Sequence, residues 1–194
     1  MSKSMRILGS TTFGTEPRQE RDYYATDPEA LRKFLDTFIA DGEKLSEDIW
    51  ECAAGEGNLS KLLRSRGKTV RESDIYDYGT NEVKNFLEYD ESWNGDIITN
   101  PPYKIAKKFI EHGLSLVEEG NKIIMLLRIQ FLESKGRHEF FKQTSPKFVY
   151  VHSSRIKIWK DNDKIKYPGT QPLCYAWYVW EKGFEGNTTL RWIK

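Results

Sequence analysis

The segment Glu51-Cys52-Ala53-Ala54-Gly55-Glu56-Gly57-Asn58 decides the fold of this 194-residue chain. It joins a stretch with strand character, residues 48–53, to an amphipathic stretch with helix character, residues 58–66. Two glycines at such a junction allow a tight turn and let a ligand approach the backbone closely. The segment therefore predicts a strand–turn–helix unit that binds a small ligand, and the alternative is a turn with no role beyond structure.

Strand and helix patterns alternate on both sides of this turn. Upstream, Asp27-Pro28 predicts a helix start, because Asp27 is a favourable N-cap and proline suits the first helical position. That helix is expected to bury one face and to end at Asp41-Gly42; the face consists of Leu31, Phe34, Leu35 and Ile39.

Downstream, further helices are expected at residues 103–119 and 133–141. Strands are expected at residues 68–75, 96–99, 122–127, 147–152 and 173–180, and no convincing helix separates the last two. This order predicts a doubly wound α/β sheet with an antiparallel hairpin at one edge.

Carboxylates follow the first two strands of this pattern. Glu51 precedes the glycines, where an acid repels a pyrophosphate but accepts hydrogen bonds from an ammonium group, and Ser60 stands where a dinucleotide site prefers a third glycine. Asp74 closes the next strand 19 positions after Gly55, a spacing suited to ribose hydroxyls, and Ile75 would then lie against an adenine ring. Glu72 is the alternative acid on the same strand face, and a surface acid at a strand end is the structural alternative.

The tetrapeptide Asn100-Pro101-Pro102-Tyr103 directly follows a short buried strand. Two prolines there force a rigid, extended turn. The Asn100 amide oxygen and the Pro101 carbonyl can then converge on one amine and keep its lone pair available, while the Tyr103 ring stacks on the flat group that bears the amine. The tetrapeptide therefore predicts chemistry on an amino group.

Charge and composition point to a nucleic-acid partner and away from a membrane. The net charge is only +1, but residues 104–166 hold 14 Lys/Arg against 7 Asp/Glu, whereas residues 1–103 hold 13 against 20. Such a split is typical of a fold with one edge facing a polyanion, although an unevenly solvated surface would look the same. No apolar run approaches the roughly 20 residues of a membrane span, and residues 1–10 lack a signal-peptide core. Two distant cysteines suggest reduced thiols, so a cytoplasmic location is expected.

The order of these motifs resembles the class I S-adenosylmethionine-dependent N6-adenine DNA methyltransferases, especially compact phage-like members. Residues 23–28 resemble the family's N-terminal motif, 51–57 its glycine loop, Asp74 its ribose acid and 100–103 its catalytic tetrapeptide. Residues 122–132 resemble its next strand and 150–158 its Arg-Ile segment, so the similarity covers residues 23–180.

The resemblance implies a Rossmann-like fold with a mostly parallel seven-stranded sheet, an antiparallel edge hairpin and helices on both faces. It implies one methyltransferase domain at 23–194, with a small target-recognition insert at about 157–172, and the polar, glycine-containing residues 1–22 are expected to form an irregular arm. It implies in-line methyl transfer from S-adenosylmethionine to N6 of adenine in DNA, with no metal. The catalytic residues would be Asn100, Pro101 and Tyr103.

The resemblance also implies two sets of binding residues. The cofactor would be bound by Tyr24, Thr26, Glu51, Ala53, Gly55, Gly57, Asp74, Ile75, Asn85, Phe86 and Asn100. Asn85-Phe86 departs from the family's acid–aromatic pair. The nucleic acid would be bound by Tyr103, Lys104, Arg155, Lys157, Lys160, Lys164 and Lys166.

Other functions are compatible with parts of this pattern. The same tetrapeptide could serve RNA or a glutamine amide, although glutamine-directed enzymes usually carry an extra N-terminal helical domain. A non-catalytic nucleic-acid-binding phage accessory protein could retain the fold. A NAD-dependent oxidoreductase is disfavoured by Glu51 and Ser60. The sequence leaves the recognition site, the strand preference and the oligomeric state open.

Overall fold

The computed structural model describes residues 23–166 and 173–194. The predicted arm at 1–22 and residues 167–172 of the predicted insert lie outside these ranges. Within them, a main sheet of eight strands comprises β2 (Asp48–Glu51), β3 (Thr69–Asp74), β4 (Glu82–Val83), β5 (Asp96–Thr99), β6 (Lys122–Arg128), β7 (Phe148–His152), β9 (Tyr175–Glu181) and β10 (Thr189–Ile193). A separate two-stranded ribbon pairs β1 (Tyr24–Thr26) with β8 (Ile158–Lys160).

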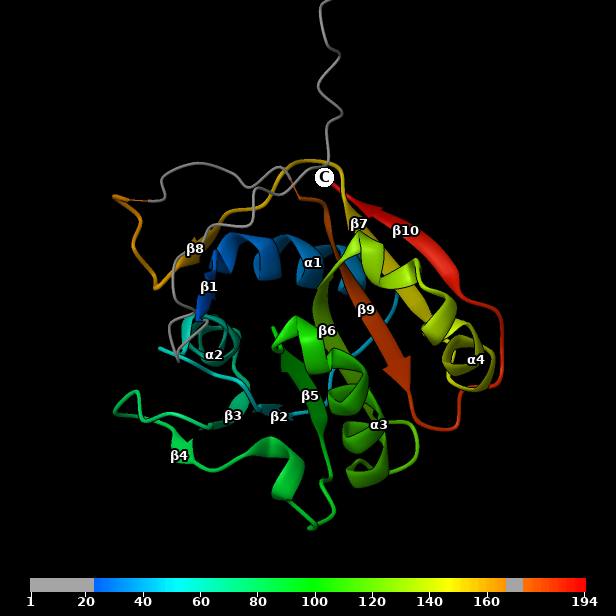
Figure 1. The fold of residues 1–194 in the computed structure, drawn as a ribbon, viewed down its shortest axis with the longest axis horizontal. Helices are drawn as coiled ribbons and strands as arrows, with labels where there is room; N and C mark the ends of the chain where they lie inside the picture. The colour runs from blue at the N-terminus through cyan, green and yellow to red at the C-terminus, as the bar shows by residue number, and fades with distance from the viewer. Residues whose placement is uncertain (1–22, 167–172) are drawn as a thin grey trace, which may run out of the picture.

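The strand order of the main sheet is β10-β7-β9-β6-β5-β2-β3-β4, as Figure 1 shows from right to left. Strand β9 is antiparallel to both of its neighbours, and the other neighbouring pairs are parallel. The predicted parallel sheet and the antiparallel pairing of the late strands are thus confirmed. The expected strand count of seven is too low, and β9 lies between β6 and β7 while β10 forms the edge.

Helices cover both faces of the sheet. They are α1 (Pro28–Ala40), α2 (Asn58–Ser65), α3 (Ala106–Leu116) and α4 (Lys135–Gln143), with short 3₁₀ turns η1 (Phe86–Glu88), η2 (Tyr103–Ile105) and η3 (Ile129–Leu132). Residues of α1 and α2 pack in one hydrophobic cluster and residues of α3 and α4 in the other. Strand β9 contributes to both clusters, because Trp177 faces the first and Tyr178 the second. This explains its continuous apolar sequence.

The first helix forms much as its sequence predicts. The Asp27 side chain accepts a hydrogen bond from the Glu29 N–H (3.0 Å), and Pro28 occupies the first position of α1. The expected burial of Ile39 is wrong: it is 58% exposed, and Phe38 is fully buried instead. Phe38 follows Leu31, Phe34 and Leu35 at helical spacing, so the buried stripe ends one residue earlier.

The edge strand β10 was not predicted. It pairs with β7, and its alternating apolar residues Leu190 and Trp192 are 46% and 63% exposed, so they face solvent and not the core. Both cysteines are free thiols; Cys52 is buried, whereas Cys174 is exposed. Among the described residues, no helix has the length and apolar character needed to cross a membrane.

Candidate functional site

The predicted site residues gather at the carboxyl ends of the parallel strands. The glycine turn follows β2, Asp74 ends β3 and Asn100 follows β5. Strands β2 and β5 are neighbours, yet the chain visits β3 and β4 on one side before it returns to β5 on the other. The site thus lies at the point where the strand order reverses, which is where open α/β sheets bind ligands.

Two glycines of the turn adopt conformations that other residues avoid. Gly55 and Gly57 have φ angles of 52° and 71°, in the left-handed region. A side chain at Gly55 would overlap the ring of Tyr23, whose hydroxyl accepts a hydrogen bond from the Glu56 N–H (3.2 Å). A Cβ at Gly57 would lie 2.8 Å from a carboxylate oxygen of Glu72. These close approaches explain why the turn requires glycine at both positions.

Three buried carboxylates surround this turn. Glu51 is 2% exposed, and Glu72 and Asp74 are each 8% exposed. The Ser60 hydroxyl donates a short hydrogen bond to Glu51, and Arg64 pairs with Glu72 at 2.8 Å. Burial is the main reason that the pKa of Glu51 rises to about 8. The Ser60 hydrogen bond opposes this rise, whereas the negative charges of Glu72 and Asp74 add to it. An arrangement of this kind attracts a cation and repels a pyrophosphate.

Asp74 is held in place by the backbone on both sides. Its Oδ2 accepts from the Gly55 N–H (2.9 Å) and its Oδ1 from the Tyr76 N–H (3.0 Å). The carboxylate therefore lies directly against the glycine turn, where the sequence predicts it. Ile75 follows at 58% exposure, so its side chain is available to a ligand. Ala53, two residues after the end of β2, is half-buried.

The side-chain amide of Asn100 is oriented by β1. Its Nδ2 donates to the Thr26 hydroxyl (3.0 Å) and to the Tyr24 carbonyl (3.3 Å). Its Oδ1 is buried and has no protein partner among the described residues. A buried acceptor without a partner is unfavourable unless a ligand supplies a donor. The structure thus links the predicted N-terminal motif to the predicted tetrapeptide and leaves one oxygen ready to accept.

The rest of the tetrapeptide forms a rigid corner. Pro101 is buried, and Pro102 begins η2 in an extended conformation (φ −58°, ψ 115°). The half-buried Tyr103 ring lies 6.1 Å from the Tyr175 ring and beneath the Arg128 guanidinium. Burial raises the pKa of the Tyr103 hydroxyl, which therefore stays protonated.

Phe86 does not contact the site as expected. It is 2% exposed, and its ring packs edge-on against Trp50 and beside Phe109. The amide of Asn85 caps η1, because its Oδ1 accepts from the Leu87 N–H and its Nδ2 donates to Glu88. The predicted cofactor contact of Phe86 is therefore wrong: its aromatic ring completes the core beneath β2.

The predicted basic segment lies next to the tetrapeptide through strand pairing. Tyr24 pairs with Lys160 and Thr26 with Ile158, so the ribbon that orients Asn100 also carries the lysines. Lys160 is half-buried and Lys164 lies over the Trp159 ring at 4.6 Å. The remaining predicted basic residues are exposed: Lys104, Arg155, Lys157 and Lys166.

Some residues of the site were not predicted from the sequence. Tyr23 covers Gly55, and Ser60 hydrogen-bonds to Glu51. Ser60 could have been found from the sequence, because a small polar residue in the first turn of α2 can reach the end of β2. No sequence signal marks Arg128 and Tyr175 as site residues, because they meet Tyr103 only through the pairing of β9 with β6.

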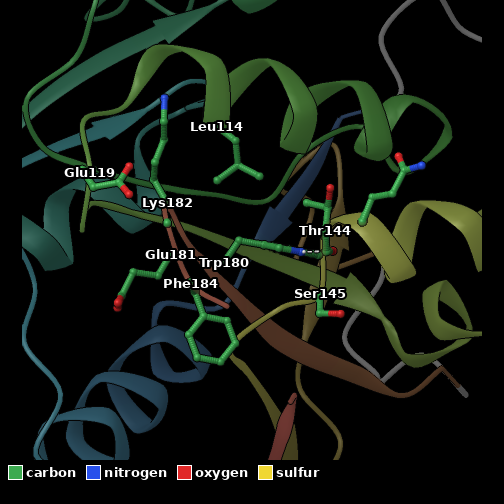
Figure 2. Close-up of a pocket in the computed structure, with 10 residues that line it drawn as sticks. Leu114, Glu119, Thr144, Ser145, Trp180, Glu181, Lys182 and Phe184 are labelled. Carbon is green, nitrogen blue, oxygen red and sulfur yellow. Dashed lines mark hydrogen bonds between the residues drawn. The ribbon is translucent and has the colours of Figure 1, made fainter. Parts of the chain in front are cut away.

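A recess lies at the end of the sheet opposite the predicted site residues. It has a volume of about 260 Å³ and is lined by residues including Leu114, Thr144 and Trp180. Figure 2 shows it beside the Trp180 indole, which donates to the Thr144 carbonyl (3.1 Å). No predicted site residue lines it. Among the described residues, no cluster of three or more His, Cys, Asp or Glu side chains could hold a metal ion.

Comparison with known proteins identifies the fold. No family profile and no curated protein sequence matches the chain. A proposed RNA methyltransferase from Pyrococcus horikoshii superposes with a TM-score of 0.62 at 14% identity, covering 88% of this chain and 91% of that one.

Two other solved structures agree with this result. A proposed class I S-adenosylmethionine-dependent methyltransferase from Listeria monocytogenes has a TM-score of 0.57 at 12% identity, covering 87% of this chain and 65% of that one. Magnesium protoporphyrin IX methyltransferase from Synechocystis PCC 6803, with bound S-adenosylmethionine, has a TM-score of 0.53 at 13% identity, covering 80% and 79%. The chain thus has the Rossmann-like class I methyltransferase fold.

Proposed function

We propose that this protein transfers a methyl group from S-adenosylmethionine to N6 of adenine in DNA. The observation that carries the proposal is the side chain of Asn100, whose amide nitrogen is bound to β1 while its buried oxygen lacks a partner among the described residues. The exocyclic amine of adenine offers a donor to that oxygen.

The residues around the glycine turn fit S-adenosylmethionine. The two glycines of the turn let Tyr23 and Glu72 pack directly against it, and Glu51 would accept from the methionine ammonium group. Asp74, fixed beside the turn, would accept from the ribose hydroxyls. The three buried acids favour a cationic ligand over the pyrophosphate of NAD.

The protein's own part in the reaction is placement. S-adenosylmethionine, when bound, supplies a methyl group activated by its own sulfonium. Asn100 Oδ1 and the Pro101 carbonyl accept from the target amine, so its lone pair stays directed outward and is less delocalised into the purine. Tyr103 holds the base by its face. Fixed orientation of this kind can account for much of a rate acceleration.

The electrostatics of the tetrapeptide's surroundings support a nucleic-acid substrate. Lys160 lies in the β1–β8 ribbon that orients Asn100. Lys157 directly precedes β8, and Lys104 directly follows Tyr103. Lysine and arginine side chains bind backbone phosphates. A target adenine in duplex DNA would have to leave the base stack, at an expense of a few kcal/mol. RNA and glutamine amides present similar amines and are the other outcomes of the test below.

The test offers tritiated S-adenosylmethionine with DNA, RNA and protein pools, followed by nucleoside and amino-acid analysis. We expect label in N6-methyldeoxyadenosine. Asn100→Ala should abolish transfer while cofactor binding, followed by calorimetry, persists.

Thr26→Val is the matched variant, because it removes only the hydroxyl that orients the Asn100 amide. It should lower the rate less than Asn100→Ala. Label only in RNA or protein would contradict the DNA assignment, and wild-type turnover by Asn100→Ala would refute the catalytic role of the tetrapeptide.

A further inference from the structure

Arg128 lies on the ring that is proposed to hold the target base. It is the last residue of β6, and its guanidinium carbon is 5.1 Å from the centre of the Tyr103 ring. Its partner across the β6–β9 ladder is Tyr175, whose ring is 6.1 Å from that of Tyr103. Three side chains from distant segments thus meet beside the end of β5, next to Asn100.

The charge of Arg128 is not neutralised by a carboxylate of the described residues. Most other arginines near the sheet have such a partner: Arg64 pairs with Glu72, Arg66 with Asp36 and Arg71 with Glu82. Arg128 is exposed, and an aromatic face holds an exposed guanidinium less strongly than a phosphate does. An anion that reaches this edge can therefore draw Arg128 away from Tyr103.

Space for a neighbouring nucleotide lies beside Tyr175. Tyr175 lines a recess of about 310 Å³, whose walls are residues 152–156 and 173–175. Ser153, Ser154 and Arg155, all exposed, offer hydroxyl and guanidinium donors there. The lining is suited to a sugar–phosphate backbone.

We propose that Arg128 binds the backbone phosphate next to the target nucleotide and in doing so uncovers the Tyr103 ring for the base. The inference rests on the proposed function and names how that site recognises a nucleic acid. In the free protein Arg128 covers one face of Tyr103. On binding, its planar guanidinium takes two phosphate oxygens, a geometry that lysine cannot reproduce. Arg128 is thus a positioning residue.

The experiment removes the phosphate charge from the substrate as well as the guanidinium from the protein. Single-turnover methyl transfer is measured with oligonucleotides that carry the mapped target adenine and one methylphosphonate at a time, at each of three positions on either side. For the wild type, one position should lower the rate by roughly 10- to 100-fold, the contribution of a hydrogen bond to a charged group.

Arg128→Ala should lower the rate on the unmodified oligonucleotide by a similar factor, and methylphosphonate at that position should then have no further effect. Arg128→Lys should restore part of the phosphate dependence. Arg71→Ala is the matched control, because Arg71 also lies over aromatic rings, at 4.5 Å from Trp50, but far from the tetrapeptide on β3. It should keep the full wild-type dependence on the phosphate.

The proposed phosphate contact and the proposed substrate fail in different ways. If the methylphosphonate lowers the rate of Arg128→Ala by the same factor as it lowers the rate of the wild type, Arg128 does not bind that phosphate. Nucleic-acid methylation would still stand in that case. If no methylphosphonate position slows the wild type, the phosphate contact itself is refuted. If the wild type transfers no methyl group to any nucleic acid but binds S-adenosylmethionine, the proposed substrate is wrong and the role of Arg128 with it.

Discussion

Replacing Glu51 with glutamine should stabilise the ligand-free protein and weaken cofactor binding. The carboxyl group is 2% exposed and its pKa is raised to about 8 from an ordinary value of 4.5. At pH 7 the unfolded chain therefore carries this group ionised, whereas the folded protein holds it mostly protonated. The corresponding loss of stability is at most about 3 kcal/mol, from roughly 1.4 kcal/mol per pKa unit.

The sign of the effect sets its pH dependence. Below pH 4.5 the group is protonated in both states and Glu51 imposes no penalty. The penalty grows as the pH rises toward 8, where the folded protein also ionises. Glutamine never ionises and can still accept the Ser60 hydrogen bond, so the Glu51→Gln variant escapes the penalty. For a chain of this size the difference in Tm at pH 7 should reach about 6–12 °C at most.

Thermal unfolding of the wild type and Glu51→Gln from about pH 5 to 8, with and without S-adenosylmethionine, measures these effects. The Tm gap should widen with pH in the absence of ligand. The ligand should raise the Tm of the wild type more than that of Glu51→Gln, because a neutral amide oxygen binds an ammonium group more weakly than a carboxylate does. Glu91→Gln, at an exposed position, should change neither. A gap that is absent, or constant over this pH range, would refute the burial argument.

Three further predictions concern the remaining parts of the site. Tyr103→Ala should slow methyl transfer and weaken base binding by roughly 1–3 kcal/mol, whereas Tyr103→Phe should keep much of the activity, since stacking needs the ring; an equal reduction in both variants would show that the hydroxyl matters instead. Asp74→Ala should weaken S-adenosylmethionine binding by about 1.5–3 kcal/mol in calorimetry. The wild type should bind NAD much more weakly than S-adenosylmethionine, and equal binding of the two would overturn the cofactor assignment. The basic residues near β8 are Arg155, Lys157, Lys160, Lys164 and Lys166. Neutralising them should reduce the slope of log Kd for DNA against log salt concentration by roughly 0.9 for each duplex phosphate that they neutralise in the wild type. An unchanged slope would identify them as ordinary solvated surface.

Local sequence signals predicted the parts of the site that local rules control. The glycine turn, the Asp27 cap and the proline corner each depend on backbone preferences of a few adjacent residues, and each forms where expected. Phe86 was wrongly assigned to cofactor binding, because the local sequence pattern of an aromatic residue after a polar one is the same for a ligand contact and for a core residue. Only the packing of Trp50 and Phe109 around it decides between the two.

Contacts between distant segments could not be read in the same way. Strands β1 and β8 have three residues each, too few to show a period, and they are more than 130 positions apart. Yet their pairing brings Thr26 to Asn100 and the lysines to the tetrapeptide. The insertion of β9 between β6 and β7 likewise places Tyr175 opposite Arg128. Long-range strand order is set by the whole core, so a local pattern carries little information about it.

The uneven charge of the sequence gains a spatial meaning from the strand order. The acidic first half of the chain supplies β2 and β3, whose buried acids line the glycine turn. The basic stretch supplies β6 and β7, on the other side of β5, and β8, which pairs with β1 beside the glycine turn. A polyanion approaching this edge is repelled by Asp74 at the glycine turn and attracted by exposed basic residues such as Lys104 and Arg128. On the proposed function, the same division keeps phosphates away from the cofactor turn and admits the methionine ammonium. A net charge near zero is therefore compatible with a nucleic-acid substrate, because binding depends on which side of the tetrapeptide each charge occupies.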